Sequence, residues 1–378
     1  MWRLLFASVL FLLSLLGVFK APTNFFWRVA VAVTEFPFVF TGVSLIFFIA
    51  CCFSKSYKIT VLVLTALAFT IFLAPIIRTY SRGSALSKSL HQIFPSSSGH
   101  SQLQKPFSFF KMFTGIGIKK VSPHTFVYKT LPEKNLTLDF YPSSFGALAP
   151  CILVIHGGSW AEGDSKQLPD LNSYLANRGY HVAAINYRLA PAHQSPAPAE
   201  DTKDALTYLI ENARKLNIDT GAFVFLGRSA GAQIALVAAY TNNNPGIRGV
   251  ISLYGPADMV WGARVKGNKL VLNTDKVFRD YLGGLIDEVP EKYRESSAVE
   301  QVSGNSPPTL IIHGDIDAMV SFEHSVHLNK KLDDYNVKHY FLDLPGATHG
   351  CDYNINGPSG QITTFAIERF INSVTSTP

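Results

Sequence analysis

One stretch, residues 224–236, constrains the fold of this chain more than any other. An apolar run leads into Gly-Arg-Ser-Ala-Gly at 227–231, and a segment rich in Ala and Leu at helical spacing follows at once. A serine between a strand end and a helix start occupies a tight, strained turn, and glycines two positions away on either side let strand and helix pack closely. The helix N-terminus directs free N–H groups at whatever Ser229 attacks. The stretch therefore predicts a nucleophilic serine at the end of a strand.

From residue 121 onwards, short apolar strands alternate with helical segments. This alternation predicts a mainly parallel sheet with helices on both faces. One buried strand delivers His-Gly-Gly-Ser-Trp at 156–160. Consecutive glycines leave backbone N–H groups open to an incoming oxyanion, because no side chain blocks the approach. We expect an oxyanion hole formed by the amides of Gly157, Gly158 and Ala230.

An acid and a histidine follow later strands. Asp315 and Asp317 lie at the end of the strand expected at 308–315, and His349 follows the strand expected at 339–344. Parallel strands bring their carboxyl ends to one edge of the sheet, where a proton relay needs the serine, the acid and the histidine. Spacing alone leaves both aspartates open as the acid.

Together these motifs resemble the α/β-hydrolase superfamily, and within it the carboxylesterase branch around hormone-sensitive lipase and the feruloyl-esterase-like and prenylcysteine-methylesterase-like enzymes. The resemblance covers about residues 125–375 and rests on the motifs at 156–160, 178–191, 227–231, 313–317 and 346–350. The family pattern His-Gly-x-x-Asp-x-x-Val falls on 313–320, which favours Asp317 over Asp315 as the acid. Ser159 and Arg228 depart from the residues usual at their positions.

The resemblance implies a serine ester hydrolase that works through an acyl-enzyme. Ser229 is then the nucleophile, His349 the general base and Asp317 the residue that orients the imidazole. Amide or formamide hydrolysis and acyl transfer with the same residues stay open, as does a catalytically silent binding protein on this fold. Neither His-Glu-x-x-His nor Cys-x-x-Cys occurs in the sequence, so we expect no metal and no cofactor.

Three further residues are weaker candidates for substrate binding: Trp160, Arg228 and Trp261. Arg228 either places a cation near the acyl site or packs against the sheet. Trp261 belongs to a long irregular segment, 256–305, which is either a lid or pocket wall or a peripheral helix pair. His324 and His327 are expected on the helix before the last strand, out of reach of the serine.

Residues 1–80 predict a transmembrane region that precedes the catalytic domain. Apolar stretches at 4–19, 29–53 and 59–77 suggest two or three spans, since a span needs about 20 apolar residues. We expect the first stretch to be an uncleaved span or anchor, although a signal peptide is the alternative. Glu35 is expected either at the interface, with the span beginning near Phe36, or buried as a functional acid.

The charge distribution supports this division of the chain. The net charge is +6, yet residues 1–100 hold eight basic residues and one acid. Such a basic N-terminal part suits short loops between membrane helices and gives no reason to expect nucleic-acid binding. The basic residues divide too evenly between the two sides to fix the orientation, so the side of the catalytic domain stays open.

Between the membrane region and the catalytic domain, 121–378, we expect a linker and an aromatic segment at 81–120. Its most flexible part is expected at 95–99. The Phe-rich run at 107–113 either packs on the catalytic core or dips into lipid beside the active site. Cys151 and Cys351 are predicted to be free thiols, because they fall at opposite ends of parallel strands.

The expected partners follow from the same features. They are a small-molecule or lipid-like ester as substrate and membrane lipids around residues 1–80, with no prediction of oligomeric state. We therefore expect an integral, multi-pass membrane protein.

Overall fold

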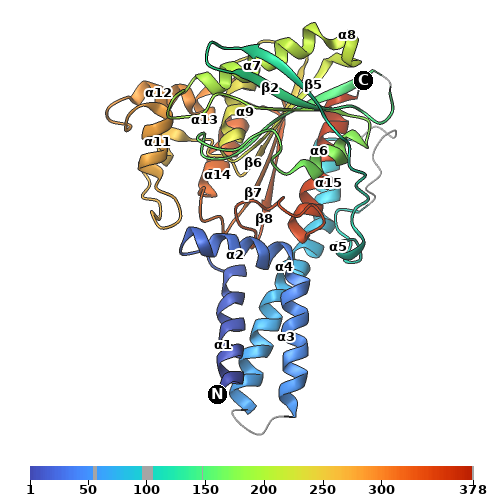
Figure 1. Cartoon of the computed structure of the whole chain (residues 1–378), viewed down its shortest axis with the longest axis vertical. Helices are drawn as coiled ribbons and strands as arrows, with labels where there is room; N and C mark the ends of the chain where they lie inside the picture. Colours follow the sequence, from blue (N-terminus) through green and yellow to red (C-terminus); the bar gives the residue numbers. More distant parts are fainter. Residues whose placement is uncertain (54–57, 96–104, 147, 377–378) are drawn as a thin grey trace.

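The computed structural model describes residues 1–53, 58–95, 105–146 and 148–376. Its C-terminal part is an eight-stranded sheet in the order β1-β2-β4-β3-β5-β6-β7-β8 (Figure 1). The strands are β1 (His124–Thr130), β2 (Asn135–Tyr141), β3 (Ala149–Ile155), β4 (His181–Ile185), β5 (Ile218–Arg228), β6 (Ile247–Leu253), β7 (Thr309–Gly314) and β8 (His339–Leu344). The pairs β1–β2 and β2–β4 are antiparallel, and every other neighbouring pair is parallel.

Helices cover both faces of this sheet, as the alternating pattern predicts. The first face carries α7 (Ala197–Glu211), α9 (Ala230–Tyr240) and α14 (Glu323–Asp334), and the second carries α6 (Pro169–Ala176) and α15 (Pro358–Thr375). Successive residues of a strand point to opposite faces. In β5, Phe223 and Phe225 accordingly join the core of the first face, while Val224 and Leu226 join the core of the second.

The segment 256–305 folds against the first face. It contains α10 (Met259–Gly262), α11 (Thr274–Leu282), α12 (Pro290–Ser296) and α13 (Ala298–Gln301). Tyr281, Leu282 and Tyr293 are buried in the same core as α9, so this segment is an integral part of the domain. A short helix, α8 (Ala213–Leu216), precedes β5.

The N-terminal part forms a stalk below the sheet domain (Figure 1). Its helices α1 (Trp2–Ser14), α3 (Pro37–Cys52) and α4 (Lys58–Ile93) run side by side, and a short 3-10 helix, η1 (Leu15–Gly17), continues α1. Helix α2 (Asn24–Glu35) lies across the top of the stalk, between it and the sheet domain.

The prediction of two or three spans needs correction. Within the described residues, α4 alone is long and apolar enough to cross a membrane. The stretch 29–53 is not one straight span, because α2 and α3 meet at an angle of 81°. The two helices are long and apolar enough to cross a membrane only if the bent pair is treated as a single span. Proline at the first position of α3 starts a new helix at residue 37. Glu35, just before the bend, is fully buried rather than interfacial.

Helix α4 also overturns part of the predicted linker, because it continues to Ile93 instead of ending near residue 77. Its second half belongs to the core of the sheet domain, where Leu86 and Leu90 are buried together with α15. Ser89 Oγ lies 2.8 Å from the hydroxyl oxygen of Tyr340 in β8. The stalk and the sheet domain therefore share one continuous helix. Of the predicted flexible part, residues 96–99 lie outside the described residues.

The Phe-rich segment contains α5 (Lys111–Thr114) and lies where the sheet domain meets the stalk. Phe107 and Met112 pack on Ile76 of α4, whereas Phe109, Phe110 and Phe113 are exposed. The segment thus packs on the stalk with one set of side chains and leaves the other set at the surface. All four cysteines are free, which confirms the prediction for Cys151 and Cys351.

Shortening a core side chain of α4 tests the shared helix. Leu90→Ala removes buried apolar contacts with the sheet domain and is expected to cost about 3 kcal/mol of stability. Ser87→Ala, on an exposed position of the same helix, should change stability by less than about 0.5 kcal/mol. Thermal unfolding in detergent measures both. Equal, small effects would mean that residues 86–93 behave as a linker.

Candidate active site

Ser229 occupies the sharp turn between β5 and α9 that the sequence predicts. Its backbone has φ 51°, a left-handed conformation that is strained for a residue with a side chain. A Cβ at position 227 would collide with the backbone of residues 231 and 232, and one at position 231 would collide with the carbonyl oxygens of residues 155 and 156. Both glycines are therefore required for strand, turn and helix to pack this closely.

Three side chains form a continuous hydrogen-bond chain at this edge of the sheet. His349 Nε2 lies 3.0 Å from Ser229 Oγ, and His349 Nδ1 lies 2.6 Å from Asp317 Oδ2. The histidine follows β8 and the aspartate follows β7, so parallel strand ends bring them together. The arrangement can move a proton from the serine hydroxyl to the imidazole while a carboxylate fixes the ring.

Asp317 is held as a carboxylate by its surroundings. Its Oδ1 accepts hydrogen bonds from the amides of Met319 and Val320, and His313 Nε2 lies 3.1 Å from Oδ2. Burial alone would raise the pKa of Asp317, but His349 and His313 outweigh burial and hold this pKa well below its usual range. Asp315 is exposed and instead accepts a hydrogen bond from the Gly346 amide.

The glycine loop after β3 lies beside the serine, with one difference from the prediction. The amides of Gly158 and Ala230 donate to no protein acceptor in the described part of the chain. The Gly157 amide, in contrast, donates to Gln167 Oε1 at 2.8 Å. In this conformation two of the three amides predicted to form an oxyanion hole are therefore free. A Cβ at position 158 would collide with the carbonyl oxygen of Glu162, so this position requires glycine.

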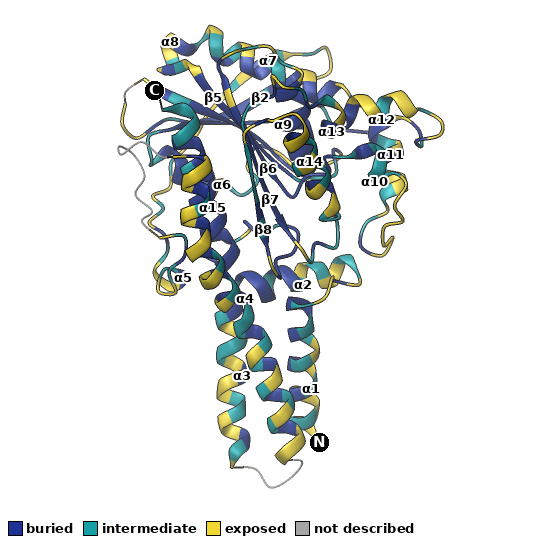
Figure 2. Cartoon of the chain, turned by 180° about the vertical axis from the view of Figure 1, so that it is seen from behind, coloured by how far each residue is buried: buried dark blue, intermediate teal, exposed yellow. Residues whose placement is uncertain are grey.

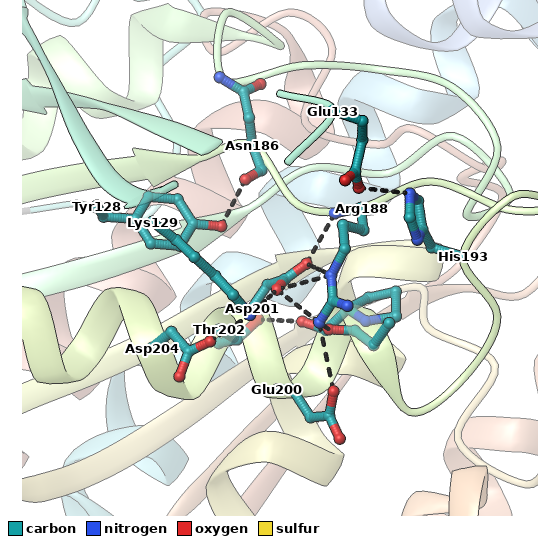
Figure 3. A network of polar contacts seen from close by, with 12 residues as sticks. Tyr128, Lys129, Glu133, Asn186, Arg188, His193, Glu200, Asp201, Thr202 and Asp204 are labelled. Atoms are coloured by element: carbon teal, nitrogen blue, oxygen red, sulfur yellow. Dashed lines mark hydrogen bonds and ion pairs between the residues drawn. The ribbon is translucent and has the colours of Figure 1, made fainter. Parts of the chain in front are cut away.

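A polar network around Asp201 holds the segment that follows β4 (Figure 3). Buried Asp201 of α7 accepts hydrogen bonds from the backbone amide and Nε of Arg188 and from Lys129 Nζ. The segment that carries Arg188 also holds the loop, because the Tyr187 hydroxyl donates to the carbonyl oxygen of His156 at 3.0 Å. The side-chain rings of Tyr187 and His156 also stack, with 4.2 Å between their centroids.

Two cavities meet at Ser229. The first has a volume of about 80 Å³. It is lined by Trp160, which follows the glycine loop, and by residues of the segment 256–305 that include Trp261. Residues of this segment line the cavity, which favours a pocket wall over a peripheral helix pair. The second has a volume of about 610 Å³ and is lined by His349, the glycine loop and one face of α2. Ser159 and Ser229 line both cavities.

The three weaker substrate-binding candidates have different environments. Trp160 and Trp261 line the small cavity. Arg228 borders the large one, but its side chain is buried and its Nε donates to Asp352 Oδ2 at 2.6 Å. Burial would lower the pKa of this guanidinium, but Asp352 and Tyr254 outweigh burial and raise it. Arg228 thus ties the serine turn to the loop that carries the histidine.

Sequence reasoning missed several residues at this site. His324 lines the small cavity, which the sequence did not indicate, and its Nδ1 lies 3.2 Å from the Asp258 amide. Its pKa is lowered to about 3 by burial, which leaves the ring neutral. Gln167 and the α2 residues carry no local motif. The amphipathic spacing of α2 was the available signal, but it was hidden inside the stretch assigned to a single span.

Comparison with known proteins agrees with this architecture. An esterase from Pyrobaculum calidifontis superposes with a TM-score of 0.59 at 21% identity, over 78% of this chain and 92% of that chain. A Thermogutta terrifontis esterase with bound butyrate gives a TM-score of 0.52 at 19% identity, over 65% of this chain and 91% of that chain. The sheet domain therefore has the α/β-hydrolase fold.

The family is also defined. The BD-FAE family model matches residues 138–332, and the chain belongs to this family. Esterase LipC of Mycobacterium tuberculosis is 30% identical over 60% of this chain and 59% of the relative. The probable carboxylic ester hydrolase LipM of the same organism is 25% identical over 61% of this chain and 55% of the relative. The chain thus spans little more than half the length of these curated relatives.

Removal of the Asp201 carboxylate tests the supporting network. Asp201→Ala leaves Arg188 and Lys129 without their buried partner and is expected to cost about 3 kcal/mol of stability. The matched control is Asp204→Ala, which removes a half-exposed carboxylate and should cost less than about 1 kcal/mol. Unfolding in urea measures both. If both variants lose the same small amount, the network does not stabilise the loop.

Proposed function

We propose that this chain is a membrane-anchored carboxylic ester hydrolase that acts through an acyl-enzyme. The observation that carries the proposal is the hydrogen-bond chain from Ser229 through His349 to Asp317, placed beside two free amides and open to two cavities. The esterase names of LipC and LipM support the same chemistry.

The reaction proceeds in two halves. Ser229 Oγ attacks the ester carbonyl carbon while His349 Nε2 takes the hydroxyl proton. The imidazolium returns this proton to the alcohol oxygen as the C–O bond breaks, which leaves an acyl group on Ser229. Water then attacks the acyl carbon and gives a proton to His349. The proton passes to Ser229 Oγ as the carboxylic acid leaves, and the free enzyme is restored.

Backbone amides stabilise the charge that develops on the carbonyl oxygen. In the proposed mechanism, Gly158 and Ala230 donate from the start, and Gly157 joins them if Gln167 is displaced. Loss of a single donor of this kind typically lowers turnover by about 10²–10³-fold. Asp317 stays ionised at every pH at which the imidazole cycles, because its pKa is strongly lowered.

Membrane anchoring is the second part of the proposal. Large apolar side chains are exposed along all three stalk helices, among them Leu5 on α1, Ile46 on α3 and Val63 on α4 (Figure 2). A soluble surface rarely exposes so extended an apolar patch. Helix α4 supplies the membrane-spanning segment in this proposal, since it is long and apolar enough to cross the roughly 30 Å hydrocarbon core.

Covalent labelling tests the nucleophile. A fluorophosphonate probe should label Ser229 in the folded full chain, because the hydroxyl is activated by His349. Ser229→Ala should abolish both labelling and turnover of p-nitrophenyl butyrate. A folded chain that takes up no label at Ser229 would favour a catalytically silent binding protein. Faster turnover of a p-nitroanilide than of the matching ester would favour an amidase.

Substitution of the two aspartates separates their roles. Asp317→Asn should lower kcat on p-nitrophenyl butyrate by about 10³–10⁴-fold, because the amide cannot hold the required tautomer or stabilise the imidazolium. Asp315→Asn is the matched control and should keep most of the activity, since this exposed side chain accepts a hydrogen bond from the Gly346 amide and not from His349. The reverse result would assign the acid role to Asp315.

A further inference from the structure

The position of His349 assigns the two cavities to the two halves of an ester. This residue must deliver a proton to the departing alcohol oxygen, so the alcohol lies on its side of Ser229. His349 borders the large cavity and is not part of the wall of the small one. The acyl group therefore occupies the small apolar cavity of about 80 Å³, and the alcohol occupies the large cavity of about 610 Å³.

One face of α2 forms a wall of this alcohol cavity. Asn24, Trp27, Arg28, Val31 and Ala32 all line it, at the spacing of neighbouring side chains on one helix face. The cavity extends to Phe36, the residue directly before α3. Its far end therefore lies at the top of the stalk, where the chain enters the membrane in the proposed arrangement.

The other faces of α2 are turned to the stalk and to the surface. Val33 is buried with Leu10 of α1 and Phe72 of α4, while Phe25 and Phe26 are exposed. The exposed phenylalanines of the segment 107–113 lie at the same junction, since Phe113 contacts Phe38 at the start of α3 with 4.9 Å between ring centroids. Exposed aromatic rings at this level are typical of a membrane interface.

Helix α2 is also hydrogen-bonded to the loop that carries His349. Trp27 Nε1 donates a hydrogen bond to the carbonyl oxygen of His349 at 3.0 Å. At the far end of the helix, Asn354 Nδ2 donates to the carbonyl oxygen of Glu35 at 2.9 Å. The helix that lies on the stalk is therefore held in place as part of the active site.

We propose that the alcohol half of the substrate is a bilayer-resident amphiphile, which reaches Ser229 from the membrane side along α2, and that its acyl half is short. The inference rests on the proposed ester hydrolysis and specifies its substrate. Hydrolysis of such an ester with water releases a short, water-soluble carboxylic acid. The long-chain alcohol stays in the bilayer.

The size of the small cavity sets the acyl length. The small cavity, at about 80 Å³, is several-fold smaller than the large one, at about 610 Å³, so the acyl half is the shorter of the two. Trp160 is fixed there, because its indole Nε1 donates to Gln233 and its ring stacks on Tyr281 with 4.2 Å between centroids. The smaller cavity favours a short acyl chain, whereas a long alcohol can extend along the larger cavity towards the stalk.

The test compares two butyrate esters that give the same acyl-enzyme and differ only in the alcohol. The full chain is reconstituted in phosphatidylcholine vesicles that contain hexadecyl butyrate, and butyrate release is measured. Soluble p-nitrophenyl butyrate is assayed on the same vesicles. The wild type should hydrolyse both esters. Ala32→Phe narrows the passage along α2 and should lower kcat/KM for hexadecyl butyrate at least about tenfold more than for p-nitrophenyl butyrate.

The matched control is Ala85→Phe, at an exposed position of α4 away from both cavities, which should leave the ratio of the two kcat/KM values unchanged. Fluorophosphonate labelling of Ser229 verifies that each variant is folded, and Ala32→Leu replaces the phenylalanine variant if that one is not labelled. Equal losses on both esters would overturn the inference. So would a wild type that cleaves only the soluble ester, and in that case the proposed hydrolase function would stand. Failure of labelling and of both assays would instead contradict the hydrolase function.

Discussion

The position of the His349 imidazole is the constraint on which the rest of the site depends. Asp317 fixes one ring nitrogen, Ser229 meets the other, and the Tyr254 ring packs edge-on with 4.5 Å between centroids. The backbone of the same residue is held by Trp27. Proton transfer tolerates little displacement of the imidazole. A loop held by several contacts keeps the imidazole at the required distance from Ser229, whereas an unrestrained loop would not. One of these contacts, the hydrogen bond from Trp27, comes from the N-terminal helices.

Most of the sheet domain could be predicted from the sequence, because its elements carry local signals. Apolar strands followed by glycine turns predicted where β3, β5 and β7 end, and parallel strand ends explain why residues 229, 317 and 349 meet. The end of α4 could not be predicted in this way. Residues 79–93 carry polar side chains on the exposed side. The apolar positions Leu86 and Leu90 indicate a buried helix face only when the sheet that covers them is known.

The missed parts of the site have a common physical cause. Gln167 and His324 reach the site through tertiary packing, and no pattern along the chain marks them. The stretch 29–53 looked like one span because hydropathy averages over a helix and cannot detect a bend. The break at Pro37 turns α2 through 81°, so that Val31 and Ala32, which belong to the predicted apolar stretch, line a cavity instead.

In the proposed arrangement, this bend gives the N-terminal region two functions, membrane attachment and a wall of the substrate cavity. In the proposed arrangement, membrane insertion orients the stalk, and the stalk in turn fixes α2 through residues such as Val33. Because α2 both lines the alcohol cavity and bonds to the His349 loop, the same contacts that place the domain at the bilayer also shape the site. Helix α4 is continuous with the sheet core, so the stalk and the sheet domain share one helix. In the proposed arrangement, burial of α2 against both the stalk and the sheet domain therefore links membrane attachment to ester specificity.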